Sequence, residues 1–209
     1  CCGAWGSFCK SYPTHRNNQR IGVATASRPE GPWQRLDHPI IDVSADESAF
    51  DSLCVTNPAA CVMPDNKILV IYKAVALAKG KIMGGKVRYG AAIADDVRGV
   101  YRKTPGKIFE SDDPHSPHWM LAEDPFIWYS HTHGRRFYAA SRDVVGSFSG
   151  ASGGICLFES ADGLNWHAAD HSKILGNQVR LGNGSLSRTK LERPALLIEN
   201  DEPIYLFGA

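Results

Sequence analysis

The sequence predicts an all-β fold, because hairpin-like segments repeat along its 209 residues and helical periodicity is absent. Segments 56–59, 123–126 and 192–195 each contain a proline, and these prolines lie 67 and 69 residues apart. Each segment leads into an apolar run, a polar turn and a second β-rich run, which is the pattern of a β-hairpin. No long stretch places apolar residues at the 3.6-residue spacing of a helix. The repeat therefore organises the whole chain.

A second series of strands lies between these hairpins. Segments 21–33, 89–101 and 155–166 each read as a strand, a turn with glycine and an aromatic residue that opens the next strand. Together the two series give about four strands per repeat. Four-stranded units that repeat radially are the blades of a β-propeller, so the predicted fold is a partial β-propeller.

The phase of the repeat predicts where the blades lie in one incomplete domain. We expect the outer strands of a first blade up to about residue 42, a second blade at about 52–110, a third at about 119–174 and the start of a fourth at about 190–209. Inner strands should start near residues 57, 124 and 193, with long loops at 74–86 and 170–190. The chain begins without Met and ends on an apolar run, so we expect a fragment truncated at both ends. Exposed sheet edges would then favour self-association through the incomplete ring.

Composition argues against two classes of partner. The net charge is +1 without a cluster of Lys or Arg, which disfavours nucleic acid and membrane surfaces. The longest apolar run, residues 68–72, is too short to span a bilayer. The six cysteines lack metal-binding spacing. Their even number permits disulfides and a secreted protein, although we expect most of them to be small buried hydrophobic residues.

Polar residues open the inner strands, where a propeller brings side chains from several blades to one central pocket. They are Asn57, Glu123, Asp124, Glu192 and Arg193. Buried carboxylates are costly unless they are paired or used, and glycoside hydrolysis requires paired carboxylates. The alternative is that each residue only caps its strand and bonds to the neighbouring blade.

In order and spacing, these motifs resemble the five-bladed propeller glycoside hydrolases of families 43 and 117. In family 43 the third blade opens with Asp-Pro and the fourth with Glu-Gly-Pro. Asp124-Pro125 matches the first motif, and Glu192-Arg193-Pro194 matches the second with Arg in place of Gly. Segments 20–24 and 31–33 are similar to family 117. The resemblance implies that Glu192 is the general acid and that Asp124 helps to keep it protonated, while the family's general base, an Asp of the first blade, falls before residue 1.

Further residues are candidates for contacts with sugar. Lys73, Arg142 and Asp143 follow second strands and are candidates to bind hydroxyl groups, with ion pairing as the alternative for each. Trp119 is a candidate to stack on a sugar ring, as is Trp5, whereas Trp128 lies in an alternating strand and is expected in the core.

The sequence predicts no metal site. Two close pairs of histidines, at 115 and 118 and at 131 and 133, lie in turns rich in Pro and Gly and are expected to be solvated. The resemblance implies a channel cation such as Ca²⁺, but the sequence shows no ligand set for one.

The expected function is that of a glycosidase, a hydrolase of O-glycosyl bonds that inverts configuration and acts from the end of a plant or algal oligosaccharide. Polysaccharide degradation outside the cytoplasm, by a secreted or periplasmic protein, would fit this activity. The alternative is a non-catalytic carbohydrate-binding propeller, which Arg193 in place of a small residue favours. Fructosyl transfer lacks support, because no Arg-Asp-Pro motif is present.

Overall fold

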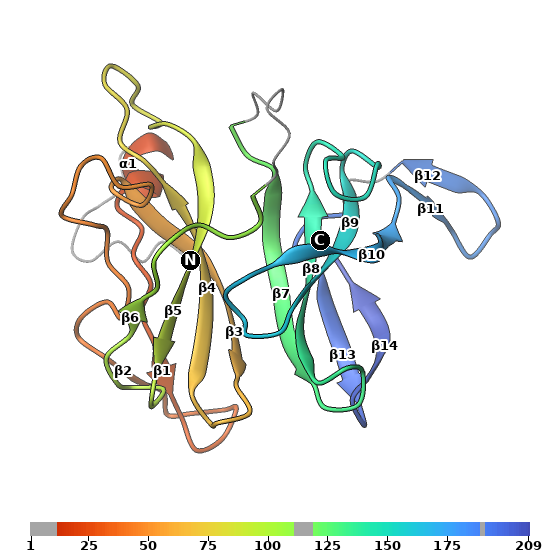
Figure 1. Cartoon of the computed structure of the whole chain (residues 1–209), viewed down its shortest axis with the longest axis horizontal. Helices are drawn as coiled ribbons and strands as arrows, with labels where there is room; N and C mark the ends of the chain where they lie inside the picture. Colours follow the sequence, from red (N-terminus) through yellow and green to blue (C-terminus); the bar gives the residue numbers. More distant parts are fainter. Residues whose placement is uncertain (1–11, 111–118, 189–190) are drawn as a thin grey trace.

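The structure is a computed structural model that describes residues 12–110, 119–188 and 191–209. The predicted all-β class is confirmed: these residues contain one helix, the six-residue α1 (Tyr12–Asn17), and otherwise strands and turns. The helix is too short to cross a membrane. Figure 1 shows two large sheets side by side, with shorter strand pairs beyond them.

Each large sheet is an antiparallel meander of four strands in chain order, which is the architecture of a propeller blade. The first consists of β3 (Cys54–Val62), β4 (Ile68–Val75), β5 (Val87–Ala94) and β6 (Arg102–Lys103). The second consists of β7 (Ala122–Ser130), β8 (Arg136–Asp143), β9 (Gly154–Ser160) and β10 (His167–Leu175). The innermost strands, β3 and β7, lie beside each other (Figure 1).

Shorter sheets lie on either side of these two blades. Strand β1 (Ala24–Thr25) pairs with β2 (Gln34–Arg35), and β13 (Ala195–Glu199) pairs with β14 (Glu202–Phe207). The chain therefore forms part of a β-propeller. The expected starts of the inner strands differ by two or three residues, because positions 57 and 124 fall inside β3 and β7, and 193 precedes β13.

A hairpin near the C-terminal part of the chain was not expected from the sequence. The predicted loop 170–190 contains a hairpin of β11 (Gln178–Arg180) and β12 (Leu186–Arg188), and β10 extends to Leu175. The turn of this hairpin contains Asn183-Gly184, and Gly184 has a φ of 84°. Asn-Gly is a strong signal for a tight hairpin turn, because it tolerates positive φ.

The core lies between the facing blades. Leu69 and Ile71 from β4 pack with Phe137 and Ala139 from β8 and with Phe158 from β9, all at most 2% exposed. Strand β4 is buried on both faces, as expected for a strand covered by sheets on either side. Alanines in the middle strands keep the side chains small where the blades meet.

The cysteines within the described residues are free thiols. Cys54 and Cys156 are buried, and Cys61 is half-buried. Burial raises the pKa of the Cys61 thiol to about 12, so it stays protonated and unreactive near neutral pH. Cys1, Cys2, Cys9 and Trp5 lie outside the described residues.

A polar clamp joins the last hairpin to the preceding blade. Asp201, in the turn between β13 and β14, accepts hydrogen bonds from the Thr132 backbone N–H at 2.7 Å and hydroxyl at 2.5 Å. It also accepts one from the Ser130 hydroxyl at 2.8 Å. The Thr132 hydroxyl and N–H, followed by Ser130, lower the pKa of Asp201 from 3.8 to about 2. This clamp holds the hairpin that follows Glu192.

We predict that Asp201→Asn loosens this hairpin, because the amide accepts these bonds less well than the carboxylate does. Amide hydrogen exchange in residues 195–207 should become several-fold faster.

The effect should depend on pH. Since the pKa of Asp201 is depressed on folding, the contribution of this carboxylate to stability is complete above pH 3.8 and is lost as the pH falls through about 2. Variant and parent should therefore converge near pH 2. Asp65→Asn is the control, because Asp65 bonds only within its own turn, to Lys67. Equal exchange in parent and Asp201→Asn at pH 7 would contradict the clamp.

Candidate functional site

A strained backbone position recurs at the start of each inner strand. Asn57, Asp124 and Arg193 have φ values of 43°, 50° and 52°, in the left-handed region that side chains other than Gly rarely adopt. Each precedes a proline. The register shifts between Thr56 and Ala59, and again between Glu123 and Phe126. Such bulges redirect side chains and occur often beside active sites.

The residues at the starts of the three inner strands line one cavity of about 510 Å³. Its walls contain Asn57 from β3, Lys73 from β4, Glu123 and Asp124 from β7, and Glu192 with Arg193 from the segment before β13. The fourth wall is α1 with the residue Gln19 that follows it. The polar residues predicted from the repeat thus converge from three blades.

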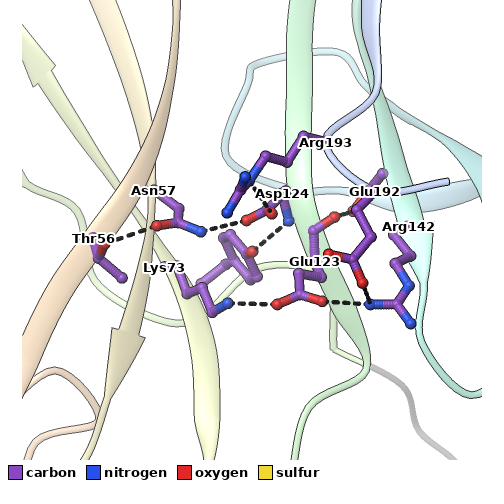
Figure 2. A network of polar contacts seen from close by, with 10 residues as sticks. Thr56, Asn57, Lys73, Glu123, Asp124, Arg142, Glu192 and Arg193 are labelled. Carbon is purple, nitrogen blue, oxygen red and sulfur yellow. Dashed lines mark hydrogen bonds and ion pairs between the residues drawn. The ribbon is translucent and has the colours of Figure 1, made fainter. Parts of the chain in front are cut away.

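A chain of ion pairs crosses the site from blade to blade (Figure 2). Lys73 Nζ lies 2.7 Å from Glu123 Oε1, and Arg142 Nη1 lies 2.8 Å from Glu123 Oε2. The same Arg142 nitrogen lies 2.9 Å from Glu192 Oε1. The side chains of Lys73, Glu123 and Arg142 are only 13–16% exposed. Glu123 is therefore the hub of the chain, with both oxygens engaged.

The second carboxylate, Asp124, is held by a separate set of bonds. Its Oδ1 accepts a hydrogen bond of 2.5 Å from Asn57 Nδ2, and its Oδ2 lies 3.4 Å from Arg193 Nε. Its backbone N–H donates to the Tyr89 hydroxyl at 2.8 Å. Burial, and then the nearby Asp124 carboxylate, raise the pKa of Tyr89 well above its ordinary value. The neutral tyrosine thus fixes the strained backbone of Asp124.

Glu192 is more accessible than the other carboxylates, with 41% of its side chain exposed. Its backbone N–H and C=O pair with Ala209 at 2.9 and 2.8 Å, which extends the hairpin ladder by one pair. Arg142 bonds one carboxylate oxygen, Oε1. Among the described residues, the other oxygen, Oε2, has no hydrogen-bond partner, and Glu192 lines the cavity.

Two residues expected to contact sugar lie elsewhere. Asp143 is fully buried and accepts bonds from the backbone N–H groups of Gly146, Phe148 and Ser149, so it anchors a loop and the prediction for it is wrong. Trp119 is 57% exposed but is not among the residues that line the cavity.

The histidines and the remaining aromatic residue have structural surroundings. His133 pairs with Glu202 at 2.8 Å, His131 packs against Tyr129, and Trp128 stacks on Tyr138 while staying half-buried. His115 and His118 lie outside the described residues. Within residues 12–110, 119–188 and 191–209, no group of three or more His, Cys, Asp or Glu residues is placed to hold a metal ion.

Sequence reasoning missed two contributors to the site. Tyr89 lies in an expected strand, and nothing in the pattern distinguishes its hydroxyl from that of any buried tyrosine. The residues of α1 lie in a stretch without periodicity, since a helix of six residues is too short to show one. Both were found only through the fold.

Comparison with solved structures identifies related folds. The chain superimposes with a TM-score of 0.55 on a thermostable family-43 glycoside hydrolase, at 14% identity over 86% of this chain. A family-117 glycoside hydrolase from the marine bacterium Zobellia galactanivorans gives 0.50 at 18% identity over 85%. A glycosyl hydrolase from Bacteroides ovatus gives 0.50 at 14% over 81%. The chain thus shares part of the fold of these glycoside hydrolases.

The chain spans about half the length of these structures, between 42% and 53%. No family model matches the chain, and no curated protein sequence does.

We predict that Glu123→Gln destabilises the fold by about 3 kcal/mol, because it leaves the poorly exposed Lys73 and Arg142 charges without their shared partner. Urea unfolding monitored by tryptophan fluorescence measures the change. Asp95→Asn is the control: its pair with Arg102 is about 70% exposed on both sides, and it should cost less than about 1 kcal/mol. Similar losses in the two variants would show that the ion-pair chain contributes no more than a surface pair.

Proposed function

We propose that this protein is a glycoside hydrolase in which Glu192 is the general acid. The main support is the cavity of about 510 Å³, which is lined by carboxylates from adjacent blades. Its volume lies in the range of small-molecule sites. The fold, shared with known glycoside hydrolases, adds support.

In the proposed reaction, a sugar unit binds in the cavity with its glycosidic oxygen beside Glu192. Glu192 donates its proton to that oxygen as the bond to the anomeric carbon breaks, and water attacks the same carbon. Asp124, fixed by Asn57 and Tyr89, is the second carboxylate of the cavity and supports the protonated acid. The resemblance assigns the base that activates water to an Asp of a preceding blade, outside this sequence.

Finer features of the reaction belong to the same proposal. A cavity of this size fits a short sugar unit better than a long chain, which favours action from the end of an oligosaccharide. We propose attack by water in a single step with inversion. Plant or algal oligosaccharides, and a secreted or periplasmic setting, suit such an activity. NMR of the first anomer released tests the stereochemistry directly.

A non-catalytic sugar-binding module is the second candidate. One observation favours it: Lys73 and Arg142 already engage Glu123 and Glu192, so these carboxylates have a structural role. Binding of oligosaccharide without hydrolysis, unchanged by Glu192→Gln, would identify this function.

We predict that Glu192→Gln lowers the rate on substrates with poor leaving groups by about 10²–10⁴, because the amide cannot donate the required proton. Activated 2,4-dinitrophenyl glycosides should be spared, since their leaving groups need little protonation. The measurement is kcat/KM for a panel of oligosaccharides and the corresponding aryl glycosides. Glu202→Gln is the matched control, because Glu202 lies on β14 and pairs with His133. Equal losses on both kinds of substrate would remove Glu192 from the role of acid.

A further inference from the structure

The charges around the cavity do not balance. The cavity and its immediate surroundings contain three carboxylates and four permanently charged cations. The carboxylates are those of Glu123, Asp124 and Glu192. These cations are Lys73, Arg142, Arg16 and Arg193. Lys73 and Arg142 are bound within the inter-blade ion-pair chain. The two cations that remain outside it, Arg16 and Arg193, are arginines on different walls of the cavity.

Arg16, on α1, is held without an acidic partner among the described residues. Its Nη1 donates to the Met83 carbonyl at 2.7 Å and to the Asn17 side-chain carbonyl at 3.2 Å. Both acceptors are neutral, so they orient the guanidinium without cancelling its charge. Both bonds use Nη1, and among the described residues Nη2 and Nε make no hydrogen bond with protein. Residues 82 and 83 thus serve as the support for α1, with Asn17 Nδ2 also donating to the Ile82 carbonyl at 2.7 Å.

Arg193 lines the same cavity from the segment before β13, directly after Glu192. Its side chain is 71% exposed, and its one ion pair with a described residue is a long contact of 3.4 Å from Nε to Asp124 (Figure 2). That contact uses Nε, so the edge formed by Nη1 and Nη2 is left for another acceptor. A guanidinium edge matches the two oxygens of a carboxylate or sulfate. The strained φ of 52° at Arg193 directs this large side chain to the site, where a glycine would adopt the conformation at no cost.

We propose that the sugar bound in this cavity carries an anionic group, which Arg16 and Arg193 bind. The substrate class is then an acidic oligosaccharide, with either a carboxylate, as in a uronic acid, or a sulfate ester. This inference rests on the proposed function for the cavity as a sugar site. It does not depend on catalysis, since recognition precedes any bond cleavage.

The test is binding of three monosaccharides that share one ring: galacturonate, galactose 6-sulfate and galactose, measured by isothermal titration calorimetry and NMR. At least one of the two anionic sugars should bind about tenfold or more tightly than galactose, since hydrogen bonds to charged groups are the stronger ones. Tighter binding of galacturonate alone would identify a carboxylate as the recognised group, and tighter binding of galactose 6-sulfate alone would identify a sulfate ester. The preference should weaken as salt rises, because the ion pairs are partly exposed.

Variants assign the effect to the two arginines. Arg16→Gln and Arg193→Gln should each lower the affinity for the anionic sugar about five- to tenfold and leave that for galactose unchanged. Arg102→Gln, on the outer strand β6, is the control and should change neither. Three results would overturn the inference. Galactose could bind as tightly as both anionic sugars, or none of the three sugars could bind. The higher affinity for the anionic sugar could also be unchanged in both Arg16→Gln and Arg193→Gln. Hydrolysis of neutral oligosaccharides that depends on Glu192 would at the same time leave the proposed function standing.

Discussion

The ion-pair chain from Lys73 through Glu123 and Arg142 to Glu192 is the interaction on which the site depends. Each cation comes from the second strand of a blade and reaches the carboxylate that opens the next inner strand. Blade packing alone is apolar and tolerates small sliding motions. Charged groups that are poorly exposed accept only geometries in which they stay paired. The chain of pairs therefore sets the positions at which the inner strands present their carboxylates.

This arrangement combines cost with precision. Left-handed backbone at Asn57, Asp124 and Arg193 costs of order 1–3 kcal/mol each, and desolvated charges add to that cost. Burial of the apolar interface between the blades offsets this cost. Asp201 holds the hairpin of β13 and β14 against the preceding blade, and the Tyr89 hydroxyl holds the strained backbone of Asp124. Strained backbone and charge occur together at the end of the inner strands that lines the cavity. Such a distribution is expected of a site that must be rigid before a ligand arrives.

The repeat made the blades predictable, because few other folds are compatible with hairpins that recur at a constant spacing along the chain. It also made the convergence of Glu123, Asp124 and Glu192 predictable, since equivalent positions of neighbouring blades meet near one axis. It could not separate Arg142 from Asp143. Successive side chains of a strand point to opposite faces, so Arg142 reaches Glu123 and Glu192, whereas Asp143 is buried beneath a loop. The role of α1 was beyond prediction, because its place over the cavity depends on tertiary contacts such as that of Arg16 with residue 83.

The most direct test of the account is a crystal structure of the Glu192→Gln variant with an oligosaccharide bound. We predict a sugar in the cavity between α1 and the inner strands, with its glycosidic oxygen within about 3 Å of the side chain at position 192. We also expect Lys73, Glu123 and Arg142 to remain paired as they are in the free protein. A sugar bound outside this cavity, or one whose glycosidic oxygen faces away from position 192, would contradict the account.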